Sequence, residues 1–354
     1  MATVYTEPVK IEVKSSPTFT SAALNKSLFI TDEHKSGDPG AANSIKVFSS
    51  SAEVGEYFGN NSKTFKAIEF FLGQKQYPAK QPLVPDFFTI LSIKKDESIT
   101  KEMVLQALSQ LALGQTFYAI DYSALPEGTL QPGDLNSWAN EYRKIVFTEN
   151  TTKTTDEKNR SNRFIELYNS KNLGEQKEYK AVSYMATVIT PGAGSKSDMN
   201  ILSMCSPDVS GGERQELTAQ NINFTEKRTS KDYVVVRTGV ATDGTDITET
   251  TAIDCIIYNL LDNLEIAMAE KGFKQDSRGY SLLEDVLSKV MGEMYNMELV
   301  ADENGQAAFT VYPITQTATE RQLKVIRPKV LFRLADFAKT IELTLERTYG
   351  EVTE

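Results

Sequence analysis

The chain has 354 residues, of which 40% are hydrophobic and 24% are charged. This length and composition predict a globular protein of roughly two domains, or of one domain with an insertion. Its 38 basic and 48 acidic side chains give a net charge of −10, which argues against a general nucleic-acid or anionic-membrane binder. Two cysteines and one histidine are too few for a disulfide framework or for most zinc sites, so the composition leans away from an enzyme.

Targeting signals are missing from the sequence. Residues 1–16 carry charged side chains between Glu7 and Lys14, so no apolar stretch resembles a signal peptide. No window approaches the roughly 18 to 20 consecutive apolar residues that a membrane helix needs. The sequence therefore predicts a soluble protein that is made in a cytoplasm and is not exported by a cleavable signal.

Residues 1–20 predict an N-terminal arm. Val9, Ile11 and Val13 alternate with charged residues, which is the period-2 pattern of a strand with one apolar face. Pro17 then breaks the pattern. A strand here must pair with something, either in its own sheet or in the sheet of a neighbour.

Residues 21–85 predict the first part of the core. Short apolar strands are expected at 28–30 and 45–48, separated by a polar loop. Ser50 stands three residues before Glu53, a capping-box spacing that predicts a helix there. A second helix is expected where apolar residues recur at helical spacing, at Phe65, Ile68, Phe71 and Leu72.

Residues 86–215 predict a middle α/β region in which strands and helices alternate. Strands are expected at 87–93, 117–120, 145–147 and 182–189. Helices are expected at 101–112, 135–143 and 162–168. Such alternation implies crossover connections and a mainly parallel sheet that is covered on both faces.

Residues 216–334 predict the C-terminal part of the core, which has a different character. A buried strand at 232–239 precedes two amphipathic helices, whose apolar residues recur over 253–268 and 282–294. Antiparallel strands are expected after these helices, at 307–312, 323–327 and 329–334. The chain is therefore α/β in its middle and α+β overall.

Residues 335–354 predict a C-terminal strand or arm. Ile341, Leu343 and Leu345 alternate with threonine and glutamate side chains, so one face of this strand is apolar and the other is wet. Both ends of the chain thus carry half-apolar strands that need a partner.

The residues that first suggest catalysis are better explained as loops. The single histidine, His34, lies in a charged run with no apolar face, which predicts a surface loop and not a catalytic base. The glycine-rich stretch at 191–197 lacks the spacing of a phosphate loop, because Ile189 stands where the first glycine would be. A turn is the expected structure there.

Other polar and aromatic residues indicate turns and core positions. The Asp-Gly and Asn-Gly pairs at 243–244 and 304–305 are cues for tight turns and lack the ligand ladder of a calcium loop. Cys205 and Cys255 are expected to be small buried hydrophobes, and Trp138 a core residue. No catalytic constellation, cofactor or metal is predicted.

One cluster of basic residues stands near the C-terminus. It comprises Lys324, Arg327, Lys329 and Arg333. A phosphate site is conceivable there, but charge complementarity with an acidic neighbouring subunit is the simpler interpretation.

The order of these features carries a resemblance. The most telling segment is 236–247, an Arg-x-Gly turn with Asp-Gly, which is followed by a long helix bearing Asp254. A short strand leads into a helix at 45–59, an aromatic helix follows at 66–74, and a strand follows at 87–93. Near the end, residues 319–328 are followed by strands that run to 347. In this order the chain resembles the tail sheath proteins of contractile phage tails and related injection machines.

The resemblance implies a structural subunit of the virion tail, assembled in the bacterial host cytoplasm. Sheath subunits form stacked six-fold rings around a tail tube, and their terminal arms add strands to the sheets of neighbouring subunits. Contraction releases stored free energy without nucleotide hydrolysis, so no cofactor is expected. The implied partners are further copies of the chain, the tail tube protein, and baseplate and tail terminator proteins, with no nucleic acid and no membrane.

Two other functions stay open. One is another tail component, such as a tube, terminator or baseplate protein, although a tube protein would be shorter and dominated by antiparallel strands. The other is an α/β enzyme that uses carboxylates or a bound metal, for which the middle sheet offers a frame but no residue spacing requires it.

Overall fold

The computed structural model describes residues 24–335 and 337, apart from short internal gaps. These gaps are 36, 41, 78–79, 96–97, 113–116, 132, 156–159, 172–176, 210–211, 229–231 and 336. The six predicted strand-addition residues all lie outside the described residues: Val9, Ile11, Val13, Ile341, Leu343 and Leu345.

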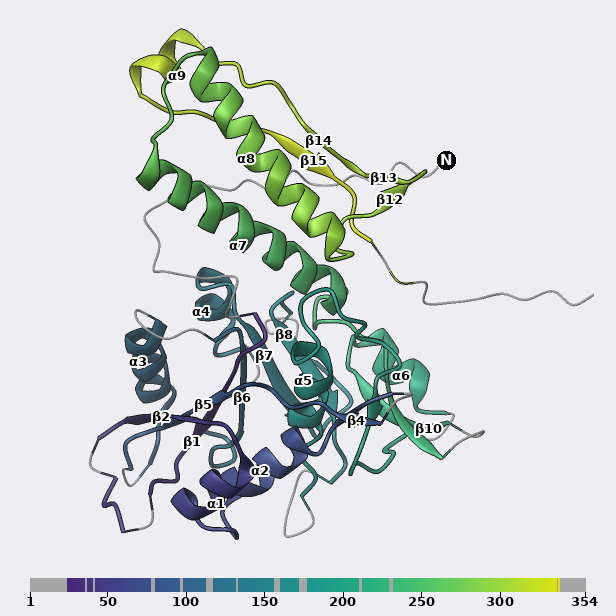
Figure 1. The fold of residues 1–354 in the computed structure, drawn as a ribbon. Helices are drawn as coiled ribbons and strands as arrows, with labels where there is room; N and C mark the ends of the chain where they lie inside the picture. The colour runs from purple at the N-terminus through teal and green to yellow at the C-terminus, as the bar shows by residue number, and fades with distance from the viewer. Residues whose placement is uncertain are drawn as a thin grey trace, which may run out of the picture.

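Within the described residues, the main sheet has six strands in the order β2-β5-β1-β6-β7-β8 (Figure 1). Their bounds in that order are Ser44–Phe48, Phe88–Ser92, Ser27–Thr31, Ala119–Ala124, Ile145–Asn150 and Phe164–Tyr168. Every neighbouring pair runs parallel except β2 with β5, which is antiparallel. The predicted mainly parallel sheet is confirmed.

Helices cover both faces of this sheet. One face packs against α1 (Ser51–Phe58), α2 (Lys63–Leu72) and α5 (Lys180–Ile189), and the other against α3 (Lys101–Ala112) and α4 (Asn136–Glu141). Strand β1 shows why, because successive side chains of a strand point to opposite faces. Phe29 therefore packs in one core cluster, whereas Leu28 and Ile30 pack in the other.

The predicted start and end of α1 are confirmed. The Ser50 side chain accepts a hydrogen bond from the Glu53 backbone N–H, as an N-cap does, and Gly59 with φ of 93° follows the last turn. The Glu53 carboxylate accepts from the backbone N–H of Ser49, one residue before the position that a capping box would use.

Two local predictions in the middle region are wrong. Residues 162–168 do not form a helix, because Phe164–Tyr168 is strand β8. Residues 182–189 do not form a strand, because they lie in helix α5, all ten residues of which are buried. A strand buried on both faces loses its alternation, and a helix buried all round loses its polar stripe, so neither showed its usual pattern.

Smaller elements lie beside the β8 edge and on the outer surface. A second sheet has the order β10-β11-β9, and its strands are Phe224–Arg228, Tyr233–Arg237 and Ile201–Leu202. Helix α6 (Arg214–Ala219) precedes β10, while β3 (Lys75–Gln76) pairs with β4 (Gln81–Pro82). We call residues 24–246 the body.

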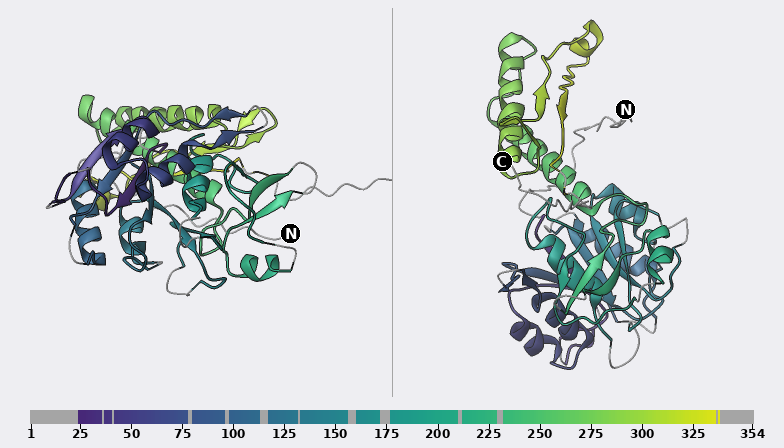
Figure 2. Two further views of the ribbon diagram at one scale, coloured as in Figure 1. Left: turned by 90° about the horizontal axis from the view of Figure 1, so that it is seen from below. Right: turned by 90° about the vertical axis from the view of Figure 1, so that its right-hand side faces the viewer.

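A slender second part projects from the body (Figure 2). It is built from α7 (Ile247–Glu270), α8 (Ser277–Asn296), β12 (Asp302–Glu303), β13 (Gln306–Ala307), β14 (Phe309–Val311), α9 (Ala318–Gln322) and β15 (Val330–Phe332). Helix α7 leaves the body, α8 returns beside it, and the β14–β15 pair lies against α8 (Figure 1). We call residues 261–335 the lever.

The predicted strand at 323–327 is wrong. Thr317 and Glu320 form a reciprocal capping box that starts the short helix α9 just before it. Lys324 then adopts a positive φ of 55°, which turns the chain back toward β15 and leaves residues 325–329 without regular structure.

Candidate functional site

The first half of α7 holds a fully buried carboxylate, that of Asp254. The Tyr118 hydroxyl donates to it across 2.7 Å, and the Arg163 guanidinium donates through both terminal nitrogens, one at 2.9 Å. The partly exposed Arg143 approaches it at 3.5 Å. The Arg163 contact is a bidentate pair, the most directional of the charge-assisted hydrogen bonds.

Two partners of Asp254, and the lysine whose pKa its charge affects, come from the amino ends of strands in the main sheet. Tyr118, Lys144 and Arg163 each stand immediately before a strand, namely β6, β7 and β8. Backbone bonds fix these strand ends, because Ile145 N–H donates to the Tyr118 carbonyl at 3.0 Å and Val146 N–H donates to the Arg163 carbonyl at 2.8 Å. Helix α7 therefore crosses the amino ends of three adjacent parallel strands.

Burial sets the protonation of this cluster. It lowers the pKa of Lys144 to about 7, and the Asp254 charge opposes that shift. Burial, and to a smaller extent the charge of Asp254, raises the pKa of Tyr118 well above its usual range. The phenol therefore keeps its proton and donates it to the hydrogen bond with Asp254. The Lys144 amine donates to the Phe117 carbonyl and lies over the Phe117 ring.

Sequence reasoning singled out Asp254 but missed its partners. Tyr118 and Arg163 are 136 and 91 positions away from it in the chain, and no spacing rule joins them. The available signal was a lone carboxylate within an apolar helical run, which must be paired if it is buried.

The lever presents the predicted basic cluster. All four side chains, Lys324, Arg327, Lys329 and Arg333, are exposed. Arg327 pairs with Glu320 of α9, and Arg333 pairs with Glu303 of β12. Lys329 lies 4.6 Å from the centre of the Tyr312 ring.

The β14–β15 pair has two different faces. Phe309, Val311 and Phe332 are partly buried and pack against the core cluster that includes α8. On the outer face Leu331, opposite Thr310 in the register, is 50% exposed. In the part of the chain that the structure describes, β14 and β15 pair only with each other, so their outer edges are open.

A second buried polar network lies between the sheet and α5. Burial raises the pKa of Glu149 on β7 to about 7 and that of Asp121 on β6 to about 6. The Lys177 amine lies 4.0 Å from the Glu149 carboxylate and donates to the Ser123 carbonyl at 2.8 Å. No group of three or more His, Cys, Asp or Glu side chains among the described residues is placed to hold a metal ion.

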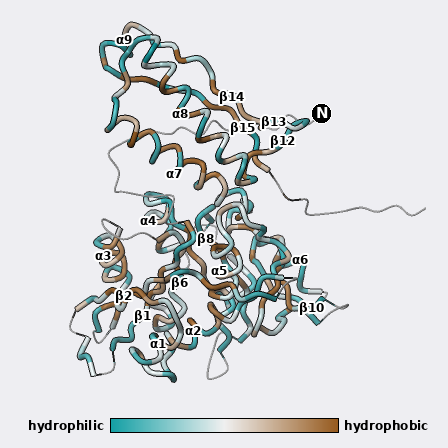
Figure 3. The backbone as a smooth tube through the Cα atoms, viewed as in Figure 1, coloured by the Kyte–Doolittle hydropathy of each residue, from teal (hydrophilic) through white to brown (hydrophobic). Residues whose placement is uncertain are grey.

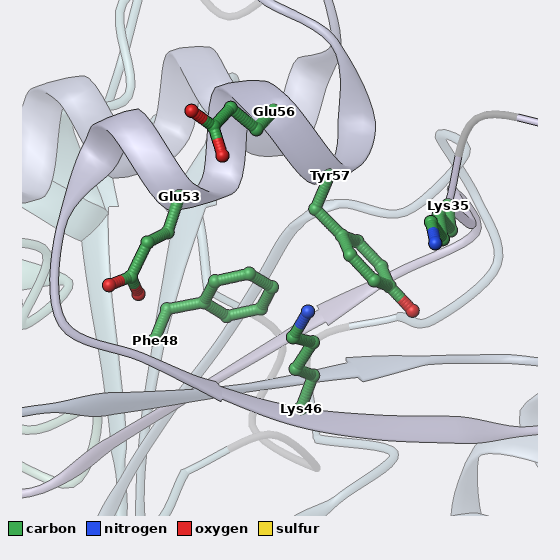
Figure 4. A pocket seen from close by; sticks show the side chains of 6 residues that line it. All are labelled: Lys35, Lys46, Phe48, Glu53, Glu56 and Tyr57. Carbon is green, nitrogen blue, oxygen red and sulfur yellow. The ribbon is translucent and has the colours of Figure 1, made fainter.

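An open depression of about 280 Å³ lies between β2 and α1 (Figure 4). Lys46 points between two rings in it, 4.1 Å from the centre of Tyr57 and 5.3 Å from that of Phe48. The Glu53 carboxylate is held by Ser49. Lys46 and Glu53 thus contact side chains next to them, and among the six residues that line the depression no nucleophile is paired with a base.

The remaining sequence predictions concern isolated residues. His34 lies in a loop but is half-buried, with Nε2 2.8 Å from the Ile93 carbonyl oxygen, so it is less exposed than expected. Trp138 is a core residue that stacks on Phe117, as predicted. Cys255 is buried and Cys205 is half-buried.

The predicted turns are also present. Residues 191–197 form a turn, although it follows helix α5 and not a strand. Asn304 and Gly305 both have positive φ in the tight turn between β12 and β13, and the backbone N–H of Thr245 donates to the Asp243 side chain in the other turn. None of the described helices is long and apolar enough to cross a membrane.

Comparison with solved structures gives full-length matches. A chain from the cryo-EM structure of the anti-feeding prophage baseplate matches with a TM-score of 0.72 and 11% identity, covering 99% of this chain and 100% of that one. The helical sheath of the same system in its contracted state matches with a TM-score of 0.68 and 12% identity, over 98% and 100% of the two chains.

A sheath tail protein from Desulfitobacterium hafniense matches with a TM-score of 0.57 and 12% identity, over 86% of this chain and 93% of that one. No protein-family model and no curated protein sequence matches the chain. These similarities lie in three-dimensional arrangement, because the identities are near 11 to 12%. The chain therefore has the fold of contractile tail sheath proteins, with both the body and the lever present.

Proposed function

We propose that the chain is a structural, non-enzymatic subunit of a contractile tail sheath. It polymerises into stacked hexameric rings around a tail tube and contracts to drive the tube through a cell envelope. The observation that carries this proposal is the full-length match to a helical sheath in its contracted state. Its place is the tail, and its partners are further copies, the tube, and baseplate and terminator proteins.

The lever supports self-association. Among the residues that the structure describes, no further strand pairs with β14 or β15, and their outer face includes the exposed Leu331. The half-apolar strands predicted at 1–20 and 335–354 have the pattern of strands that add to an edge of such a strand pair in a neighbouring subunit, where main-chain bonds give affinity and alternate side chains give register.

The four basic residues at 324–333 are proposed to lie near acidic groups of a neighbouring subunit. Arg327 and Arg333 already pair within the lever, so a neighbour would extend these pairs into a network. Such exposed charges set register and association rate more than affinity.

A baseplate position is the second candidate. The match to the anti-feeding prophage baseplate chain has the higher TM-score of the two matches from that system. A sheath subunit extends into long tubes, whereas a baseplate component stops at a ring or short collar, so the length of the assemblies separates the two.

Negative-stain microscopy of the purified full chain tests the proposal. We expect rings and tubes, and we expect deletion of residues 1–18 to abolish them while leaving the circular dichroism spectrum intact. A sharp monomer at every concentration would refute the sheath role, and unchanged polymerisation of the deletion variant would refute the arm.

A further inference from the structure

Helix α7 changes its environment halfway along. Residues 247–260 hold all of its buried side chains, among them Asp254, Ile256 and Tyr258, whereas no residue from 261 to 270 is buried. The helix is continuous through this change, and α8 begins beyond its far end and packs back along it (Figures 1 and 2). The contacts of its first half, together with Leu299 of the lever, which lies against Gly194 of the body, therefore set the direction of the lever.

Apolar packing alone leaves that direction loosely determined. The hydrophobic contacts of side chains such as Ile256 have no preferred direction, whereas a bidentate Arg–carboxylate pair has a fixed planar geometry. Asp254 makes such a pair with Arg163, and its Oδ2 also accepts from the Tyr118 hydroxyl.

The next turn of α7 adds a second directional contact. The Tyr258 hydroxyl donates to the Arg143 carbonyl at 3.0 Å, and the guanidinium of the same Arg143 reaches Asp254. Arg143 has a positive φ of 48°, so the corner between α4 and β7 is bent to present both groups to α7. Residues at two strand starts, Tyr118 and Arg163, and this corner thus hold one face of the helix.

We propose that the Asp254 cluster, made of Asp254, Arg163, Tyr118, Arg143 and Tyr258, is a rigid joint that fixes the angle between the body and the lever. Arg163 and Asp254 are its positioning residues. Its consequence for assembly rests on the proposed sheath function, because a neighbour can dock on the lever in register only if the lever points in one direction. The joint itself is a property of the single subunit.

The size of the effect follows from the length of the lever. Helix α7 runs 16 residues beyond Asp254, from 254 to its end at 270, which corresponds to about 24 Å. A tilt of about 10° at the joint moves that end of the lever by about 4 Å, close to the spacing of paired strands. A small loss of angular definition at Asp254 therefore shifts the lever against a neighbouring subunit by nearly one strand spacing.

A distance measurement within one subunit tests the joint directly. Spin labels at Gln106→Cys on α3 and Ser288→Cys on α8, both exposed positions, report the body-to-lever distance by pulsed electron paramagnetic resonance. Cys205 and Cys255 are replaced by serine and alanine so that only the two labels are present. We expect a narrow distance distribution in this background.

Two substitutions perturb the joint. Arg163→Lys keeps the positive charge but cannot make the bidentate pair, so it is expected to broaden or shift the distribution by about 3 Å or more while the protein stays folded. Asp254→Asn leaves Arg163 buried without its counter-charge and is expected also to lower the melting temperature by roughly 5 to 10 °C.

Asp208→Asn is the matched control. It breaks the buried Lys180–Asp208 ion pair, both of whose side chains are fully buried in the body, far from α7 in sequence. We expect a similar fall in melting temperature with an unchanged distance distribution. That contrast separates positioning from general stabilisation.

The outcomes are distinct. A broad distribution in the labelled background, or a narrow and unshifted one in both joint variants, overturns the rigid joint. A broadened distribution in the joint variants alone supports it. Failure of the unlabelled chain to polymerise would refute the sheath function but would leave the distance result, and hence the joint, unaffected.

Discussion

The body and the lever use their apolar residues differently. In the body, the six-stranded sheet has a buried cluster on each face, so five of its strands are largely buried, and the edge strand β2 is the exposed one. In the lever, α8 covers only one face of the β14–β15 pair, and Leu323 and Leu331 remain at least half exposed. Figure 3 shows hydrophobic residues recurring along the projecting elements. Apart from β2 and a few surface positions, the body buries its apolar residues in its own core, whereas the lever keeps an apolar side chain exposed on the outer face of β14–β15, where the proposed neighbour would dock.

The largest expected effect is in the core of the body. Phe147 on β7 is fully buried and packs edge-on against Tyr184, with ring centroids 5.8 Å apart. Phe147→Ala is expected to lower the free energy of unfolding by about 3 to 5 kcal/mol, measured by urea denaturation, because it leaves a cavity between sheet and helix. The control is Phe337→Ala, at a position that is 55% exposed, where the change should be within about 0.5 kcal/mol. Equal losses at the two positions would contradict the contrast.

A leucine pair compares the two regions by one chemical change. Leu108 on α3 and Leu287 on α8 are both buried. Leu108→Ala is expected to cost about 3 to 4 kcal/mol and Leu287→Ala about 2 kcal/mol, because Leu108 packs against the six-stranded sheet whereas α8 packs only against α7 and the small β14–β15 pair, which can close over a cavity more readily. Urea denaturation of both variants measures the difference. A larger loss for Leu287→Ala would show that the lever is packed as tightly as the body.

This contrast also explains which parts of the fold the sequence could predict. Helices α3 and α8 each have one wet face, so the period of their apolar residues was visible, and both predictions are confirmed. Helix α5 and strand β8 are buried on all sides, and the sequence predicted a strand in place of the helix and a helix in place of the strand. Within the deepest layer the binary pattern disappears, and only tertiary packing decides between helix and strand.

The candidate site was predictable only in part. Asp254 was noted only as part of the segment that resembles sheath proteins, and its ion pair with Arg163 depends on the register of three strands and on the crossing of α7. Such convergence is set by topology and leaves no trace in local spacing. The basic residues at 324–333 were visible because they are near one another in the chain, and whether they meet a neighbouring subunit stays a prediction.

The pH dependence of the free energy of unfolding should come from the body and not from the lever. Glu149 is buried in the body with its pKa raised to about 7, so between pH about 4.5 and 7 the folded protein holds this proton more tightly than the unfolded chain does. The free energy of unfolding that this group contributes therefore falls as the pH rises through that window and stays low above it. Lys177, 4.0 Å away, offsets part of the loss.

Glu149→Gln isolates this contribution. The stability of the variant relative to the natural chain is expected to increase from pH 5 to pH 8 by roughly 1 to 3 kcal/mol, as measured by urea denaturation at several pH values. Glu265→Gln on the exposed part of α7 is the matched control and should leave the stability profile unaltered. A pH-independent difference for Glu149→Gln would show that the carboxyl is solvated.

The smallest change in the free energy of unfolding is expected on the outer face of the β14–β15 pair, where the effect on assembly should be large. Leu331 is 50% exposed and faces away from α8, so Leu331→Ser should change the free energy of unfolding by no more than about 0.5 kcal/mol. The same change removes an apolar contact from every copy of the proposed interface, and assembly repeats that loss along the whole tube. We therefore expect shorter or fewer tubes by light scattering and microscopy at an unchanged melting temperature.

Val84→Ser, at a body position that is 60% exposed, tests whether any exposed apolar residue has this effect. If both variants reduced assembly equally, the lever would have no special part in it, whereas a selective loss in Leu331→Ser would locate the unfilled apolar surface on the lever.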